Sequence, residues 1–239
     1  SRGLGDVYKR QGHTMPFTGF TSETGEFLWE LAFHNEKPWF EAHKEQFLRA
    51  VKEPFDALAK ETLALMRQKH LDEPYCLHIS RIYRDARRLF GRGPYKDHLW
   101  FTLWTGEDRH NSPVFWFELS PASFSYGVGF YTATAEQMAA LRRYIDANPA
   151  EMERLARRVA KSEFHLEGEP YKRLKKDVGE VLNPWYNRKW ISLCAEYDHG
   201  GALYTGELPQ VLLDAYEKLM PVYRLLKRFP EESSNASLV

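Results

Sequence analysis

The chain has 239 residues, of which 43% are hydrophobic and 28% charged, as in an ordinary globular protein. Its 33 basic and 33 acidic residues cancel, which weighs against a dedicated nucleic-acid binder, a class that usually carries a basic excess. No apolar run approaches the roughly 18 residues that span a bilayer, so no membrane partner is expected. Cys76 and Cys194 lie far apart without a Cys-x-x-Cys motif, which argues against a disulfide framework and a zinc site.

The two ends of the chain differ from the rest. Residues 1–14, SRGLGDVYKRQGHT, precede the first methionine and show no periodicity, so we expect a non-native leader. The polar residues 231–239 are expected to form a disordered tail. These limits leave one domain over residues 15–230. Reduced thiols and the absence of a signal-peptide pattern favour the cytoplasm.

Helical periodicity dominates the chain from residue 21 to about residue 66. Thr21 or Ser22 is placed to cap a first helix, whose apolar stripe includes residues 27, 28 and 31. A second helix is predicted from Pro38, since proline suits a first helical turn. A third begins near Pro54. The three segments predict a helical layer.

The middle of the chain predicts strands. Four short runs are rich in β-branched and aromatic residues and are separated by turn residues: CLHISRIYRD at 76–85, DHLWFTLWT at 97–105, PVFWFELS at 113–120 and SFSYGVGFY at 123–131. Short connections between consecutive strands favour an antiparallel meander.

Helices return after the fourth strand. Thr134 and Gln137 form a capping box at the start of one helix, and Pro149 opens another. Further along we expect a short strand near Phe164, a weak helix over 171–182, a strand over 190–198 and a last helix over 208–229, kinked or interrupted at Pro221. The order predicts an α+β fold, with an antiparallel sheet flanked by N-terminal and C-terminal helices.

Period-two alternation divides the predicted sheet into an apolar and a polar face. Leu99, Phe101 and Leu103 share one face, which we expect to pack on helices. Lys96, His98, Trp100, Trp104, Trp116 and Glu118 fall on the other. Gly127 and Gly129 within the fourth strand indicate close approach, either of a packed helix or of a ligand for which they form the floor.

The segment RIYRDARRLFGRGPYK, residues 81–96, has six basic residues and one acid. Asp85 is placed to hold Arg84 or Arg87, which leaves other guanidinium groups without a local acid. Arginine matches phosphate or carboxylate oxygens bidentately, and the glycines of GRGPYK let backbone N–H groups approach an anion. The segment therefore predicts a site for an anionic small molecule, and its ligand-binding residues are Arg81, Tyr83, Arg84, Arg87, Arg92, Tyr95 and Lys96, with Trp39 from the helical layer.

Two other interpretations of the arginines stay open. They brace the fold by pairing with distant acids such as Glu41 or Glu118, or they are surface charge. If the site is catalytic, phosphoryl or nucleotide chemistry is the natural hypothesis, with Asp85 or Glu118 as the base. The pattern lacks a Walker loop, a G-x-S-x-G elbow and a histidine spacing for a metal, and it indicates no particular cofactor.

A second basic region raises the alternative of nucleic-acid binding. It comprises Arg154, Arg157, Arg158, Lys161, Lys172, Arg173, Lys175 and Lys176, and it lies near Trp185, Tyr186 and Trp190 in the sequence. If these aromatic rings are exposed, they could stack on single-stranded bases. The plainer interpretation is a solvated helix face.

The chain resembles a family of microbial proteins known as domain of unknown function 2461. The resemblance runs from Phe17 to about Phe229 and lies in HNEKPWFEAHKEQF, RIYRDAR and PYK. The matched positions are Asn35, Trp39, Phe40, Lys44, Arg81, Tyr83, Arg84, Asp85, Arg87, Arg92, Pro94, Tyr95 and Lys96. Residues 88–91 depart from the family pattern. The resemblance implies no particular activity.

Overall fold

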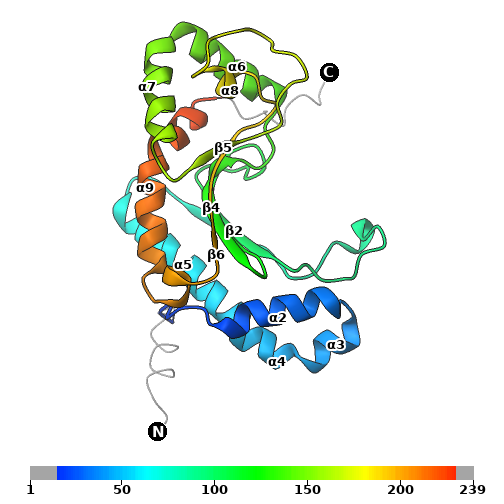
Figure 1. The fold of residues 1–239 in the computed structure, drawn as a ribbon. Helices are drawn as coiled ribbons and strands as arrows, with labels where there is room; N and C mark the ends of the chain where they lie inside the picture. The colour runs from blue at the N-terminus through cyan, green and yellow to red at the C-terminus, as the bar shows by residue number, and fades with distance from the viewer. Residues whose placement is uncertain (1–14, 230–239) are drawn as a thin grey trace, which may run out of the picture. The chain divides into compact units, whose positions relative to one another are not determined.

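The computed structural model describes residues 15–229 (Figure 1). The predicted leader at 1–14 and tail at 231–239 lie outside the described residues. The described chain forms an α+β fold with an antiparallel six-stranded sheet, and its strand order is β1-β2-β3-β4-β6-β5. The predicted fold class and the meander of the first four strands are therefore confirmed.

The chain divides into two compact units. Of the described residues, unit 1 contains 15–103, 117–125 and 196–214, and unit 2 contains 104–116, 126–195 and 215–229. The prediction of one domain over 15–230 stays a prediction.

Unit 1 begins with the predicted helical layer. Its elements are α2 (Ser22–Phe33), α3 (Lys37–Ala42), α4 (Lys44–Phe47), the π-helical turn η1 (Leu48–Lys52), α5 (Glu53–Lys69) and β1 (Cys76–Ile79). Thr21 caps α2 through a capping box with Thr24. The predicted stripe of α2 is buried, and Phe27 contacts Phe47 with a ring separation of 5.7 Å.

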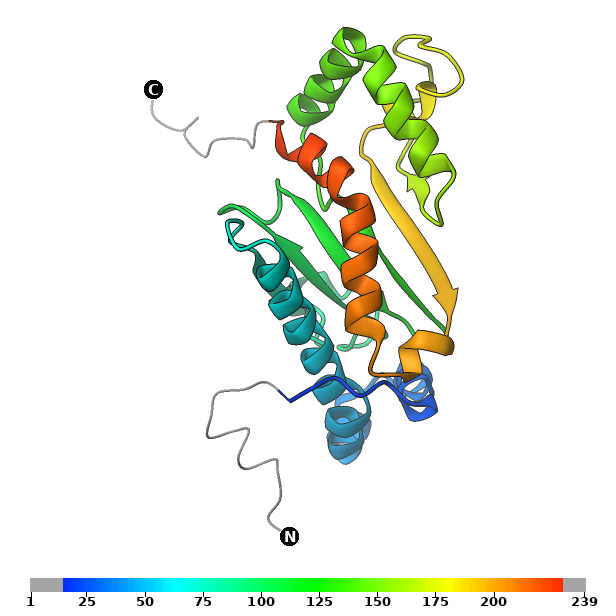
Figure 2. The same cartoon turned by 90° about the vertical axis from the view of Figure 1, so that its left-hand side faces the viewer.

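The three central strands are β2 (Leu99–Trp104), β3 (Pro113–Leu119) and β4 (Ser123–Phe130). The predicted apolar face of β2 is fully buried. In unit 1, α5 covers this face, as Figure 2 shows, and Phe55 lies 5.8 Å from Phe101 and 6.0 Å from Phe117 between ring centroids. The side chains of His98, Trp100 and Glu118 on the other face stay partly exposed. The alternation therefore predicted the two faces correctly.

Unit 2 contains the helices α6 (Ala135–Ala147) and α7 (Pro149–Ala160), which pack together. Its other elements are β5 (His165–Glu167), the single turn α8 (Asn183–Tyr186) and β6 (Ser192–Asp198), whose last residues belong to unit 1. Thr134 and Gln137 form the predicted capping box. The turn η3 (Gly201–Tyr204) and the long helix α9 (Leu208–Lys227) end the described chain, and α9 continues through Pro221 without interruption.

Three local predictions were wrong. The helix expected over 171–182 is absent from that stretch of the described chain. Backbone groups there bind the side chain of Asn187 instead of one another. Asn187 Oδ1 accepts the Lys175 N–H at 2.8 Å, and Asn187 Nδ2 donates to the Lys176 carbonyl at 3.0 Å. The first strand ends at Ile79 instead of residue 85. At Gly127 and Gly129 the close neighbours are the backbones of Leu193, Ile191 and Ser192, so a strand and not a helix or ligand fills the space.

Candidate functional site

Residues 81–96 leave the sheet after β1 and return to it at β2, as a loop that we call the basic excursion (Figure 1). The two arms of the basic excursion pair with each other. The Arg84 N–H donates to the Pro94 carbonyl at 2.8 Å and the Lys96 N–H donates to the Ile82 carbonyl at 2.7 Å, with Tyr83 and Tyr95 opposite each other. This pairing brings residues twelve positions apart in the sequence, Arg84 and Lys96, into one short ladder.

Asn35, at the corner between α2 and α3, fixes the returning arm. Its Nδ2 donates to the Tyr95 carbonyl at 2.8 Å, and its Oδ1 accepts the Tyr95 N–H at 2.9 Å. The Asn35 side-chain amide therefore makes the two backbone hydrogen bonds to Tyr95 that a neighbouring strand would otherwise make. Gly93 permits this contact, because a Cβ atom there would collide with the Asn35 side chain. Phe40 completes the contact by stacking on Tyr95 with a ring separation of 4.2 Å.

Among the described residues, five of the six cations of the basic excursion have no acid within ion-pair distance, and three of these five act electrostatically on one another. Arg81 is exposed and Arg84 and Lys96 are half-buried, and none of the acids that the structure describes lies within ion-pair distance of them. Arg84 Nη1 donates to the Gly93 carbonyl at 3.0 Å, and Lys96 Nζ lies 4.3 Å from the centre of the Trp100 ring. We call Arg81, Arg84 and Lys96 the cation triad.

The members of the cation triad repel one another. Burial lowers the pKa of Lys96, and the positive charges of Arg81 and Arg84 lower it further. The three groups therefore lie within electrostatic reach, and holding them together disfavours the charged form of Lys96. A bound anion would remove this repulsion.

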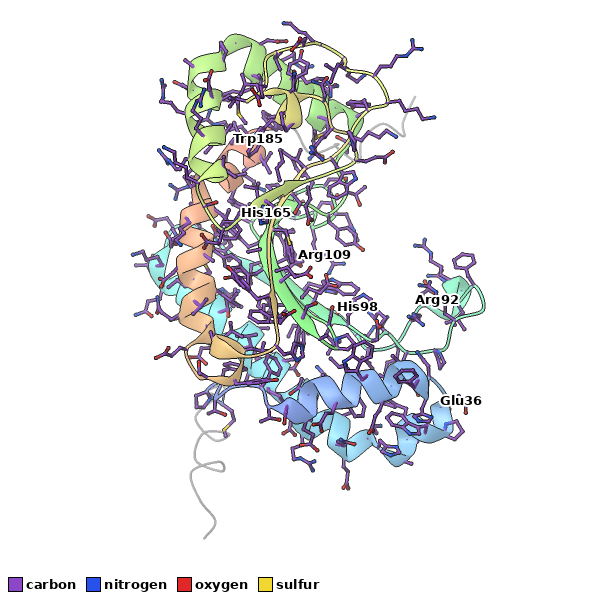
Figure 3. The ribbon with its side chains drawn as sticks, viewed as in Figure 1. Glu36, Arg92, His98, Arg109, His165 and Trp185 are labelled. Atoms are coloured by element: carbon purple, nitrogen blue, oxygen red, sulfur yellow. The ribbon has the colours of Figure 1, made fainter. Side chains whose placement is uncertain are left out.

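The other two predicted cations, Arg87 and Arg92, bind groups within the turn of residues 85–92. The Arg87 guanidinium binds Asp85 with an Nη2–Oδ2 distance of 2.9 Å, which confirms one of the two pairings expected for Asp85. Arg92 donates to the carbonyls of Leu89 and Arg88 at 3.2 and 3.1 Å. Figure 3 shows Arg92 on the basic excursion, away from His98 on the sheet. Arg87 and Arg92 thus hold the turn of the excursion.

Trp39 and Tyr83 have different surroundings. The half-buried ring of Trp39 stacks against His43 at 4.0 Å and His34 at 5.5 Å, which explains its presence without a ligand. Tyr83 remains 49% exposed, and its ring lies 5.4 Å from that of the buried Tyr95.

The two predicted bases are in opposite environments. Hydrogen bonds from the side chain and backbone of Arg87 lower the pKa of Asp85 to about 2, so Asp85 is a poor proton acceptor near neutrality. Burial raises the pKa of Glu118; His98 opposes this shift, and Glu196 and Asp97 add to it. Neither Glu118 nor Glu41 forms an ion pair with an arginine in the part of the chain that the structure describes.

The second basic region in unit 2 differs from its prediction. Trp185 and Tyr186 are buried with exposures of 3% and 6%, so they cannot stack on bases, whereas Trp190 is 39% exposed. Several of the cations are engaged: Lys176 binds Asp146 at 2.9 Å and Arg157 binds Glu153 at 2.7 Å. Of the three aromatic residues considered for a nucleic-acid interface, Trp190 alone is exposed.

Some residues that build the site escaped the sequence analysis. Asn35 and Phe40 were noticed only as part of a family pattern, because their contacts with Tyr95 span 60 and 55 residues of sequence. His98 and Asp97 also meet on the polar face, where Asp97 Oδ1 lies 2.9 Å from His98 Nδ1. Within residues 15–229, no group of three or more His, Cys, Asp or Glu side chains is arranged to hold a metal ion. No described helix is both long and apolar enough to cross a membrane.

Comparison with protein families identifies the family of the chain. A family model described as "Conserved hypothetical protein (DUF2461)" matches residues 23–224, which include both motifs and the whole basic excursion. This match confirms the resemblance inferred from the motifs. No curated protein matches the chain.

Proposed function

The chain belongs to the DUF2461 family, and we propose that it binds a small phosphate- or carboxylate-bearing ligand at the cation triad. The observation that carries the proposal is that Arg81, Arg84 and Lys96 lie together without an acid, although the chain has as many acids as bases. A fold that only needed bracing would place a carboxylate among them. Functional sites commonly keep charges in such unfavourable arrangements.

The rigid support of the triad favours binding over incidental surface charge. Asn35, Gly93 and Phe40 fix the arm that ends in Lys96, and the paired arms fix Arg84. Preorganised donors bind an anion more tightly because less side-chain freedom is lost on binding. Arg84 supplies the planar guanidinium that matches two oxygens of one anion.

An enzymatic role would use Glu118 and not Asp85. The pKa of Glu118 is raised, mainly by burial, which is the direction that favours proton exchange by a carboxyl group in a general acid or base role. Asp85 is held ionised by Arg87. Phosphoryl or nucleotide chemistry remains a proposal, and it is secondary to binding.

A thermal-shift screen with nucleotides, sugar phosphates and dicarboxylates tests the proposal. A ligand at about 100 times its Kd stabilises the protein by roughly 2.7 kcal/mol. Arg84→Gln should abolish the shift. Arg87→Gln is the matched control in the same segment, because Arg87 is paired with Asp85, and it should retain the shift.

Two results would contradict the proposal. One is that none of the anions shifts the wild-type protein. The other is that Arg84→Gln and Arg87→Gln lose the shift equally, since this would indicate general charge and not the triad. Steep salt dependence with single-stranded nucleic acid, and no response to small anions, would favour the nucleic-acid alternative.

A further inference from the structure

The polar face of β2 and β3 carries the aromatic ring of Trp100 and the carboxyl group of Glu118. The His98 ring stacks with Trp100 at a centroid distance of 5.6 Å, on the same indole that Lys96 approaches to 4.3 Å. Glu118 of β3 lies within electrostatic reach of His98. Figure 3 shows His98 on this face of the sheet. The Trp100 indole therefore connects the cation triad with the neighbourhood of Glu118.

Glu118 is half-buried, and no side chain among residues 15–229 forms a hydrogen bond or ion pair with it. Burial is the largest effect on the pKa of Glu118 and raises it. The charge of His98 lowers this pKa, and the charges of Glu196 and Asp97 raise it. A carboxyl group removed from water without a donor is unfavourable, and it is relieved by a hydrogen bond from outside the protein.

His98 acts electrostatically on Glu118 but forms no hydrogen bond or ion pair with it in the part of the chain that the structure describes. The imidazole of His98 is instead oriented by Asp97, at 2.9 Å between Nδ1 and Oδ1. The cations of the triad do not supply it either, because none of them forms an ion pair with Glu118. The same surface of unit 1 thus holds unpaired positive charge and an unpaired carboxyl group that the fold keeps apart.

We propose that the ligand of the cation triad carries, besides its anionic group, a second group that donates a hydrogen bond to Glu118. An ammonium or a hydroxyl group has the required chemistry. This inference rests on the proposed function, because the triad must hold the anionic end. The ligand class is therefore an amino- or hydroxy-substituted phosphate or carboxylate.

Calorimetric titration with matched phosphate esters tests the inference. The probes are inorganic phosphate, n-alkyl phosphates, ω-aminoalkyl phosphates and ω-hydroxyalkyl phosphates of equal and increasing chain length. At the best length, the substituted ester should bind the wild-type protein about tenfold more tightly than the plain alkyl ester, which is typical of a charge-assisted hydrogen bond. Comparing esters within one protein cancels any general change in charge.

Two variants assign the preference to Glu118 and identify the donor. If the donor is an ammonium group, the preference should disappear in both Glu118→Gln and Glu118→Leu. If it is a hydroxyl group, Glu118→Gln should keep much of the preference, because an amide oxygen still accepts, and Glu118→Leu should lose it. Ser125→Ala on β4 serves as a control for a polar change in the same unit.

The results separate the inference from the proposed function. Equal affinity for substituted and plain esters at every length, with phosphate binding still abolished by Arg84→Gln, overturns the inference alone. A preference that persists unchanged in Glu118→Leu also overturns it. Failure of inorganic phosphate and of all esters to bind overturns the proposed function and the inference together.

Discussion

Replacing Asn35 by alanine should loosen the basic excursion more than the loss of one surface side chain would suggest. The Asn35 amide makes two hydrogen bonds to the backbone of Tyr95, at 2.8 and 2.9 Å, and Tyr95 is only 2% exposed. The substitution leaves one N–H and one carbonyl without a partner. Each unsatisfied buried group costs about 1–3 kcal/mol, so we expect a loss of roughly 2–5 kcal/mol if water does not enter.

Urea denaturation of Asn35→Ala and wild type measures this loss directly. The matched control is Glu36→Ala, since Glu36 is exposed, makes no side-chain cap for α3 and should change stability by less than about 0.5 kcal/mol. Asn35→Ala should also weaken anion binding, because the arm that ends in Lys96 is no longer fixed. A loss below about 0.5 kcal/mol with unchanged anion affinity would refute the role assigned to Asn35.

Three further predictions concern other contacts of the two units. Gly93→Ala should lower the free energy of unfolding, measured by urea denaturation, by about 1–3 kcal/mol, because the new Cβ collides with Asn35. A variant as stable as the wild-type protein would refute the close approach of Gly93 to Asn35. NMR titration should place the pKa of Asp85 near 2, and Arg87→Ala should raise it toward 3.8. Because folding lowers the pKa of Asp85, the Asp85–Arg87 pair stabilises the folded protein at pH values above the unfolded pKa, and this contribution disappears as the pH falls toward 2. An Asp85 pKa that Arg87→Ala leaves unchanged would contradict the pairing. Asn187→Ala should cost about 2–4 kcal/mol, because backbone groups of Lys175 and Lys176 lose their partners, and accelerated proteolysis of 171–182 should accompany it.

The sheet was predictable because its signal is local. Alternation along 99–103 and 115–119 assigns each side chain to a face from its neighbours alone, and the structure confirms the buried face. The capping boxes at Thr21 and Thr134 each lie within four residues, although the sequence identified the partner only for Thr134. Such elements depend on short-range geometry, which a single sequence contains.

The basic excursion could be predicted only in composition. The sequence showed an excess of arginine in 81–96, but not which cations lack an acid. Asp85 lies next to Arg84 and two positions before Arg87 in the sequence, and the 3₁₀ turn η2 (Ala86–Arg88) brings Arg87 and not Arg84 onto its carboxylate. The arm pairing depends on Asn35 and Phe40, which lie far away along the chain. Long-range contacts of this kind leave no periodic signal.

The sequence also could not predict whether a single aromatic side chain is buried or exposed. The nucleic-acid alternative requires Trp185 and Tyr186 to be exposed, yet both are buried, and the Tyr186 hydroxyl donates to Asp146 at 3.0 Å. An aromatic residue next to lysines has the same local pattern whether it packs inward or outward. Tertiary packing decides between these cases.

The most direct test of the central claim is the unfolding free energy of Lys96→Met, measured with and without phosphate. Methionine keeps much of the packing on Trp100 and removes one of the three repelling charges. Without phosphate, we predict a stability within about 1 kcal/mol of wild type or above it. Phosphate should then stabilise the wild-type protein and have little effect on the variant. A loss of about 3–5 kcal/mol without phosphate, as when a buried ion pair is broken, together with no phosphate effect on wild type, would contradict an unpaired cation triad.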